Sequence, residues 1–217
     1  PLGPLEPSYG DTLFAKAARE VGYHPFPVPA SNASAPHTNP YGVRLGPCNY
    51  CGFCEGYGCY MYSKTSRQAS ILPSLEQFRN FELRTQAYVT KVNTDSSGKI
   101  ATGVTYIDAA GREVEQTADL VILCAYQFHN ARLLMLSNIG EQYDPKTGKG
   151  VVGKNYCYQM GGGVTAVLKE GTHLNVFSGA GAGATAIDDF NGENFDHTDL
   201  VFIGGAAIWH IRTGGRP

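Results

Sequence analysis

The sequence predicts a mixed α/β fold, and three patterns of apolar residues carry this prediction. Residues 12–21 repeat apolar side chains at helical spacing, residues 81–117 alternate apolar and polar side chains, and residues 120–124 are continuously apolar. These periods indicate an amphipathic helix, half-buried strands, and a strand buried on both faces. The composition agrees, because 42% hydrophobic and 17% charged residues in a chain of 217 are typical of a folded globular protein.

The helix predicted at 12–21 has recognisable start and stop signals. Asp11 is suited to the N-cap position, and Gly22 is suited to end the helix. The prolines in Phe26-Pro-Val-Pro favour an extended segment after it, and residues 31–46 are expected to form a loop.

Residues 81–117 predict an antiparallel β-meander. Alternation begins at Leu83 and runs to Thr90. The turn Asp95-Ser-Ser-Gly98 leads to a second strand at 101–108, and Ala110-Gly111 leads to a third at 113–117. Charged residues are expected on the solvated face of this sheet.

The apolar run Leu120-Val-Ile-Leu-Cys124 predicts a strand of a parallel sheet, because both of its faces need burial. A helix is expected at 130–137, ending near Gly140, so that strand and helix form half of a βαβ unit. Beyond it, β-prone runs separated by polar loops occupy residues 164–210, where Trp209-His210 is expected in the core.

Four of the six cysteines lie within twelve residues, and this cluster is the strongest chemical signal in the chain. Cys48, Cys51, Cys54 and Cys59 are separated by steps of three, three and five residues. Such spacing lets one tight loop direct several thiolates at a point, as iron–sulfur clusters require. Two disulfides or plain thiols are the structural alternative, and zinc is a third, although zinc sites usually use two separated pairs.

Other polar and glycine-rich motifs favour structural interpretations. The run 179–183 (Gly-Ala-Gly-Ala-Gly) lacks the full G-x-G-x-x-G spacing, and together with Gly161-Gly-Gly163 it predicts tight loops. Asp188-Asp189 and residues 191–196 predict a solvated loop rather than a calcium site, because their order does not match an EF-hand.

The six histidines show no metal-ligand spacing. They are His24, His37, His129, His173, His197 and His210. Only His129 follows the predicted buried strand, at the carboxyl end where open α/β sheets bind ligands. Packing or surface roles are the favoured interpretation for each.

Charge and hydropathy exclude two classes of function. A formal net charge of -2 with no Lys/Arg run gives no electrostatic basis for binding nucleic acid. No apolar run reaches transmembrane length, and no signal peptide precedes the first helix.

Five segments in order resemble the glucose–methanol–choline (GMC) family of FAD oxidoreductases, and with the cysteine run they are most similar to its sugar-acid dehydrogenases. They are Asn80–Val89, Gly103–Tyr106, Leu120–Ala125, Leu133–Gly140 and Gly150–Asn155. Two positions depart from the family pattern. The family's usual Ser-Gly-Ile-Gly is Ser137-Asn-Ile-Gly140 here, and its usual Ala-Gly is Ala125-Tyr126.

The resemblance implies part of a Rossmann-like FAD-binding domain and part of an antiparallel substrate domain. It assigns the FAD contacts to Val89, to the turn Cys124-Ala125-Tyr126, and to Gly153-Lys154-Asn155. Related dehydrogenases carry a 3Fe–4S cluster, for which three of the four clustered cysteines would suffice. The implied reaction is oxidation of a CH–OH group of a sugar acid or polyol. Electrons would pass through the iron–sulfur centre to a cytochrome-type acceptor, and the alternative is a non-catalytic iron–sulfur electron-transfer module without flavin.

The same resemblance supplies an expected domain plan and setting. Residues 1–46 are expected on the substrate-domain side, 47–66 as the cluster loop, 67–160 in the FAD-binding domain, and 161–217 at the start of the substrate domain. The family's pyrophosphate-binding G-x-G-x-x-G and its catalytic histidine have no counterpart here, so an internal fragment is expected and no catalytic base is assigned. Expected partners are a small subunit and a cytochrome c subunit. The expected location is periplasmic, with membrane association through those partners.

Overall fold

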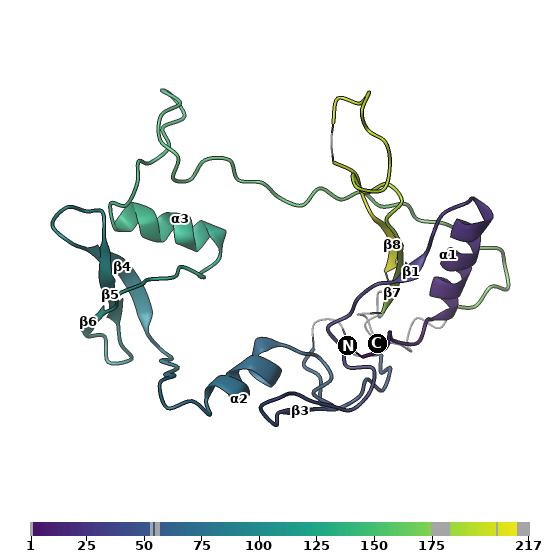
Figure 1. The fold of residues 1–217 in the computed structure, drawn as a ribbon, viewed down its shortest axis with the longest axis horizontal. Coiled ribbons are helices and arrows are strands. Elements are labelled where there is room, and N and C mark those ends of the chain that lie inside the picture. The colour runs from purple at the N-terminus through teal and green to yellow at the C-terminus, as the bar shows by residue number, and fades with distance from the viewer. Residues whose placement is uncertain (1, 53, 55–56, 175–182, 203, 212–217) are drawn as a thin grey trace. The chain divides into compact units, whose positions relative to one another are not determined.

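The computed structural model describes residues 2–52, 54, 57–174, 183–202 and 204–211. The chain divides into two compact units, which we treat separately. The first joins Pro1–Glu82 to Val167–Pro217, and the second is Leu83–Ala166. Figure 1 shows the elements of both units along the chain.

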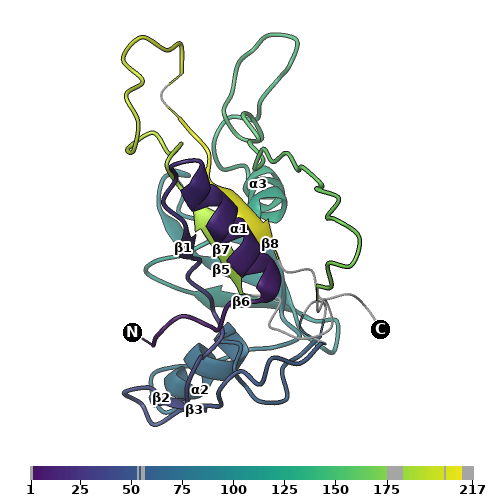
Figure 2. The ribbon, with the colours of Figure 1, turned by 90° about the vertical axis from the view of Figure 1, so that its right-hand side faces the viewer.

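The first unit is built around a small antiparallel sheet covered by one helix. The sheet has the order β1-β7-β8, with β1 at Phe26–Pro27, β7 at Ala184–Ile187 and β8 at Ile208–Ile211. Helix α1 (Tyr9–Glu20) packs on β7 and β8, as can be followed in Figure 2. Of the apolar face predicted from the sequence, Ala18 is buried and Leu13 and Phe14 are partly buried, whereas Ala17 and Val21 are exposed.

Helix α1 begins earlier than the sequence predicted. Its N-cap is Ser8, and Asp11 is the third helical residue, so the assignment of Asp11 as the N-cap was wrong. The Ser8 hydroxyl accepts from the Asp11 backbone N–H, and the Asp11 carboxylate accepts from the Ser8 N–H at 2.8 Å. This capping box satisfies two free donors at once, which a cap at Asp11 alone would not do.

The predicted end of α1 at Gly22 is confirmed. Val21 is the C-cap, and Gly22 follows with φ +90°, a conformation that favours glycine. The N–H groups of Gly22 and Tyr23 donate to the carbonyls of Arg19 and Ala18 at 3.1 and 2.9 Å, which is the Schellman pattern.

Short strands precede the cysteine segment of the first unit, and short helices follow it. The predicted loop at 31–46 contains a two-residue pairing of β2 (His37–Thr38) with β3 (Arg44–Leu45). After the cysteines, a π-helical turn η1 (Arg67–Ile71) continues into α2 (Leu72–Leu75).

The second unit contains the predicted β-meander. Strands β4 (Tyr88–Thr94), β5 (Ala101–Ile107) and β6 (Glu113–Thr117) pair antiparallel in chain order. Both turns are confirmed, since Gly98 N donates to Asp95 O and Gly111 N donates to Asp108 O, each at 3.0 Å. The first strand begins at Tyr88, so its predicted beginning at Leu83 was wrong.

Helix α3 (Gln127–Leu136) packs on β4 and confirms the helix predicted at 130–137, with a start three residues earlier. Val92, Tyr106 and Leu133 form the buried centre of this unit. Ser137 lies between helix and sheet, because its hydroxyl accepts from Val92 N at 2.8 Å and donates to Leu133 O at 2.6 Å.

The strand predicted at 120–124 is absent from the structure. The segment is extended but pairs with no strand among the described residues, and Leu120 and Ile122 are each 73% exposed. The strands that the structure describes pair antiparallel, so no parallel sheet is available to bury this run. A strand buried on both faces needs paired strands on its edges and cover on both faces, whereas here only Val121 and Leu123 are partly buried.

Three further predictions have mixed outcomes. Trp209 is 56% exposed, so its assignment to the core was wrong, while His210 is partly buried. Gly161-Gly-Gly163 lie in exposed extended chain and not in a tight loop. Most of the glycine run at 179–183 lies outside the described residues.

None of the helices in the described ranges has the length and apolar character of a membrane-spanning segment.

Candidate functional site

The four clustered cysteines line a single cavity in the first unit. Its volume is about 260 Å³, and its wall also includes Asn32, Asn49, Tyr57, Gly58, Tyr60 and Lys64. All six cysteines of the chain are free thiols, so the pairing into disulfides does not occur in this structure. Within the described residues, no three His, Cys, Asp or Glu side chains are grouped closely enough to hold a metal ion. The thiols therefore share a cavity without converging on one point.

Backbone hydrogen bonds fasten both ends of the cysteine loop to the same base. The Ala33 carbonyl accepts from Cys48 N at 2.7 Å and from the Ser63 hydroxyl at 3.1 Å. Ala33 N donates to Ser63 O at 2.9 Å, and Ser63 is fully buried. Gly46 N adds a bond of 3.1 Å to Met61 O. The segments before and after the loop are thus held together, which brings cysteines eleven positions apart in the sequence to one cavity.

Asn32 and Lys64 connect the base to the middle of the loop. Cys54 is 9% exposed, and the amide Nδ2 of Asn32 lies 4.0 Å from its sulfur. Lys64 Nζ donates to the Cys54 carbonyl and, at 2.8 Å, to the Tyr57 carbonyl. The cationic head of Lys64 is therefore held beside the thiols.

The surroundings of Cys59 favour its thiolate form. Burial raises its pKa, but the backbone N–H groups of Lys64, Ser63 and Met61 and the charge of Lys64 oppose this and leave the pKa below its usual value. A lowered pKa favours the thiolate, which is the form that binds metals. The four cysteines supply the donor type that iron–sulfur clusters use and line one cavity, although no three of these described thiols are grouped closely enough to hold a metal ion.

The FAD contacts implied by the family resemblance all lie in the second unit. Tyr126 caps α3 with φ +69° and is 58% exposed, and Cys124 and Ala125 before it are exposed. The side chain of Asn130 fixes this turn, because its Oδ1 accepts from Ala125 N at 2.9 Å and its Nδ2 donates to Leu123 O at 3.1 Å.

An aromatic cluster brings the turn at 124–126 and the segment at 153–155 to the same place. The ring centroid of Phe128 lies 5.5 Å from that of Tyr126 and 4.8 Å from that of Tyr156. Gly153 has φ +88°, and a Cβ there would lie 2.7 Å from the methyl group of Met135 in α3. The Met135 methyl group could move to make room, so the positive φ is the feature that favours glycine at 153.

Lys154, Asn155 and Val89 are the other residues predicted to contact FAD. Lys154 lies over the ring of Tyr143, with 5.1 Å from Nζ to the centroid, and Asn155 has φ +57°. Val89 lies in β4 opposite Tyr106 and is 36% exposed. Phe128 links Tyr126 to Tyr156, the residue after the 153–155 segment, so two of the three predicted segments are connected through intervening rings. Among the described residues, no hydrogen bond or ring contact links Val89 to either of them.

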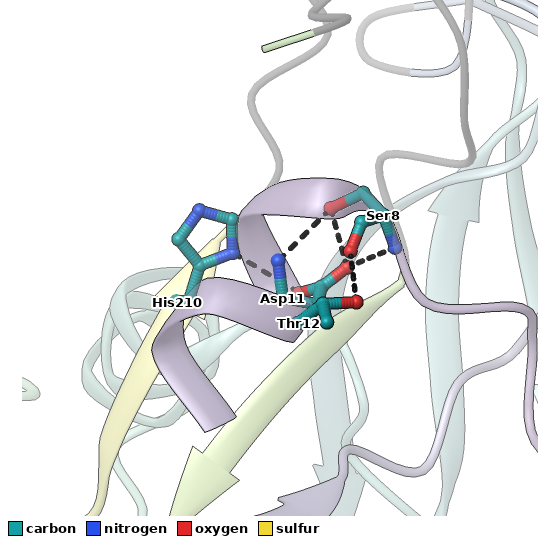
Figure 3. A network of polar contacts seen from close by, with 4 residues as sticks. All are labelled: Ser8, Asp11, Thr12 and His210. Carbon is teal, nitrogen blue, oxygen red and sulfur yellow. Dashed lines mark hydrogen bonds and ion pairs between the residues drawn. The ribbon is translucent and has the colours of Figure 1, made fainter. Parts of the chain in front are cut away.

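The histidines lie apart from the cysteine cavity. His129 is exposed in the first turn of α3. His24 Nδ1 is 2.6 Å from Asp189, whose pKa this partner holds below its usual value. His210 Nδ1 is 3.0 Å from the buried carboxylate of Asp11, which connects β8 to the cap of α1 (Figure 3). These two contacts are explained by packing between elements.

The family model described as GMC oxidoreductase matches residues 12–160. The chain belongs to the GMC oxidoreductase family. The gluconate 2-dehydrogenase flavoprotein of Pantoea cypripedii is 52% identical over 217 residues, which cover all of this chain and 35% of that protein. The paromamine 6'-oxidase of Streptomyces fradiae is 28% identical over 171 residues, covering 77% of this chain and 29% of that protein.

The 6'''-hydroxyparomomycin C oxidase of Streptomyces lividus is 27% identical over 163 residues, covering 73% of this chain and 28% of that protein. The chain thus spans about a third of the length of these relatives. Membership of the family confirms the resemblance seen in the sequence.

Sequence reasoning missed the residues that support these sites. Asn32, Lys64, Asn130 and Phe128 stand in no recognisable motif. Asn32 precedes the cysteines by a long loop, so only the fold shows that its amide reaches Cys54. Asn130 was detectable in principle, as a polar residue in the first turn of a helix that follows an exposed turn.

Proposed function

We propose that this chain is part of an FAD-dependent dehydrogenase that oxidises a CH–OH group of a sugar acid or polyol, with gluconate as the type of substrate. The observation that carries the proposal is the 52% identity, over the whole chain, to a gluconate 2-dehydrogenase flavoprotein. The two oxidases named above share far less sequence, so they support the reaction class more than the substrate.

Val89, Cys124-Ala125-Tyr126 and Gly153-Lys154-Asn155 are the residues that would hold FAD. Two of these segments approach the Phe128 cluster, through Tyr126 and through Tyr156. FAD supplies the acceptor for the hydride that leaves the alcohol carbon, while a base removes the hydroxyl proton. We assign that base to no residue of this chain.

The cysteine cavity would hold an iron–sulfur centre, with 3Fe–4S as the favoured form. Three thiolates suffice for such a cluster, and Cys48, Cys51, Cys54 and Cys59 all face one cavity. Since a hydride delivers two electrons and a cluster accepts one at a time, the centre would pass electrons singly to a cytochrome-type acceptor.

The partners and the location follow from the same proposal. A small subunit and a cytochrome c subunit would complete the enzyme, and it would lie in the periplasm, attached to the membrane through those subunits. The support is the similarity to a protein named as the flavoprotein of its enzyme.

The rival function is an iron–sulfur electron-transfer module without flavin. Membership of the GMC family favours the flavoenzyme, because the family match covers the residues expected to contact FAD. Acid extraction of the purified holoprotein decides between the two, since released FAD supports the flavoenzyme and its absence supports the module.

The iron–sulfur centre is tested by iron and sulfide analysis and by the visible spectrum. We expect iron, acid-labile sulfide and a broad visible absorbance beyond that of flavin. Cys54→Ser and Cys59→Ser are each expected to lose the broad absorbance while keeping FAD. Cys157→Ser is the matched control, because Cys157 is an exposed free thiol outside the cavity. A pure flavin spectrum that is unchanged in the two cavity variants would refute the centre.

A further inference from the structure

We propose that Asn32 and Lys64 form a positioning pair that holds Cys54 in the cysteine cavity and sets the reduction potential of the centre bound there. The inference rests on the proposed iron–sulfur centre and adds two residues that lie outside the cysteine run. Its basis is a set of contacts that both residues make to the same cysteine from the same piece of backbone.

The pair stands on a rigid base. Asn32 and Lys64 face each other in an isolated antiparallel bridge. On one side Ala33 N donates to Ser63 O at 2.9 Å, and on the other Thr65 N donates to Ser31 O at 2.8 Å. The Thr65 hydroxyl adds a further bond of 2.7 Å to the Ser31 carbonyl. Hydrogen bonds on both sides of the bridge thus fix the backbone from which the two side chains extend.

From this base the two side chains reach different atoms of Cys54. The Asn32 amide approaches the sulfur at 4.0 Å, and Lys64 Nζ donates to the Cys54 carbonyl. Lys64 also donates to Tyr57 O at 2.8 Å, so one ammonium group binds two carbonyls of the loop. Cys54 is buried, whereas the other three cysteines of the run are only partly buried, which agrees with contacts to Cys54 from two residues.

The chemistry of these two groups favours added negative charge in the cavity. One-electron reduction of an iron–sulfur centre adds one negative charge to the cluster and its thiolates. An amide N–H directed at a thiolate sulfur and a nearby ammonium both stabilise that charge, more strongly in a partly buried site than in water. Hydrogen bonds to the sulfurs and the surrounding charge are established determinants of cluster potential. Removing either group should therefore make the centre harder to reduce.

A purely structural role for Lys64 predicts a different result. If the side chain only staples the loop, its loss would lower the content of bound iron without changing the potential of the clusters that remain. If its charge acts on the centre, the potential itself shifts. The midpoint potential, followed by electron paramagnetic resonance or visible absorbance, separates the two roles.

The experiment compares Asn32→Leu and Lys64→Met with wild-type holoprotein. Leucine has the size of asparagine without its donor, and methionine keeps the length of lysine without its charge. Asn49→Leu is the control for the first change, because Asn49 also lines the cavity but its amide donates to the hydroxyl of Tyr60. Lys64→Arg is the control for the second, because it keeps the positive charge and the donors.

We expect a more negative midpoint potential in Asn32→Leu and Lys64→Met, faster loss of iron to a chelator, and unchanged FAD content. Asn49→Leu and Lys64→Arg should stay near the wild-type potential. Wild-type potentials in both test variants, with iron still bound, would overturn the inference and leave the proposed function standing. Absence of iron from the wild-type protein would overturn the proposed centre and this inference with it. If Lys64→Met fails to fold, the comparison of Asn32→Leu with Asn49→Leu still decides.

Discussion

Two residues adopt backbone conformations that explain how this chain departs from its family's pattern. Tyr126 and Asn138 stand where the family resemblance expects glycine, and both have positive φ, +69° and +55°. An L-residue in the left-handed region costs roughly 1–2 kcal/mol, and asparagine tolerates it better than most. Both positions therefore have the backbone conformation that glycine adopts most easily, although neither residue is glycine.

Asn138→Gly is expected to stabilise the second unit by up to about 1 kcal/mol, because glycine adopts positive φ without strain. Asn138→Ala is expected to destabilise it by about 1 kcal/mol, because a Cβ without a compensating polar group is strained there. Asn138 closes α3, since its N–H donates to Met135 O at 3.2 Å and Ile139 N donates to Leu134 O at 3.0 Å. Urea unfolding measures both changes.

The control for this comparison is Asn93→Gly in β4, where the backbone is extended and the side chain bonds to Glu115 and Thr105. Glycine should destabilise that position. If glycine had the same effect at 93 and at 138, the positive φ of Asn138 would not be the determining factor.

At the scale of elements, the cap of α1 is the point where the helix joins the far end of the chain. Asp11 is 1% exposed and binds the Ser8 N–H at 2.8 Å, the Ser8 hydroxyl at 2.6 Å and His210 Nδ1 at 3.0 Å. One carboxylate thus closes the capping box and connects α1 to β8. Gly10 belongs to the same contact, because a Cβ there would lie 2.8 Å from the His210 ring.

Asp11→Ala is expected to destabilise the first unit by about 2 kcal/mol, because it removes part of a helix cap and leaves partly buried donors without their charged acceptor. Ser8→Ala should cost about 1 kcal/mol, since it removes the cap and leaves the Asp11–His210 contact. Hydrogen exchange of the α1 amides and denaturant unfolding measure the two effects. Equal losses in the two variants would show that the His210 contact adds nothing.

The elements that sequence patterns predicted are those whose stabilising contacts are local. The meander followed from alternation and from turn residues such as Asp95 and Gly98, whose bonds span a few positions. The run at 120–124 has equally strong β-propensity, but a strand also needs a partner, and no local pattern reveals whether one lies beside it.

The contrast between local patterns and long-range contacts also applies to the candidate site. The spacing of Cys48, Cys51, Cys54 and Cys59 is readable in the sequence, and the structure places all four at one cavity. Asn32 and Lys64 could not be predicted, because their contacts with Cys54 depend on a bridge between segments more than thirty residues apart. Long-range pairing of this kind leaves no periodic signal.

At the scale of the whole molecule, the two kinds of chemistry belong to different compact units. The cysteine cavity lies in the unit formed by Pro1–Glu82 and Val167–Pro217, and the residues proposed to contact FAD lie in Leu83–Ala166. Each site is supported by contacts within its own unit, such as Ala33–Ser63 for the cavity and Asn130–Ala125 for the turn before α3. A change at the cysteines should therefore leave the FAD contacts intact.

This separation predicts that Cys54→Ser divides the overall reaction into two measurable parts. In the variant holoenzyme, an oxidisable sugar acid such as gluconate should still bleach the flavin absorbance, because the residues proposed to bind FAD are unaffected. Reduction of the proposed cytochrome-type acceptor should fall by about tenfold or more, because losing the proposed one-electron route would need to raise the barrier by only about 1.4 kcal/mol. Stopped-flow absorbance follows both events in one experiment, and Cys157→Ser should match the wild-type protein in both.

If Cys54→Ser slowed flavin bleaching as much as acceptor reduction, the cysteine would be needed for substrate oxidation itself. If it slowed neither, electrons would leave the flavin by another path, and the cavity would have no part in the transfer.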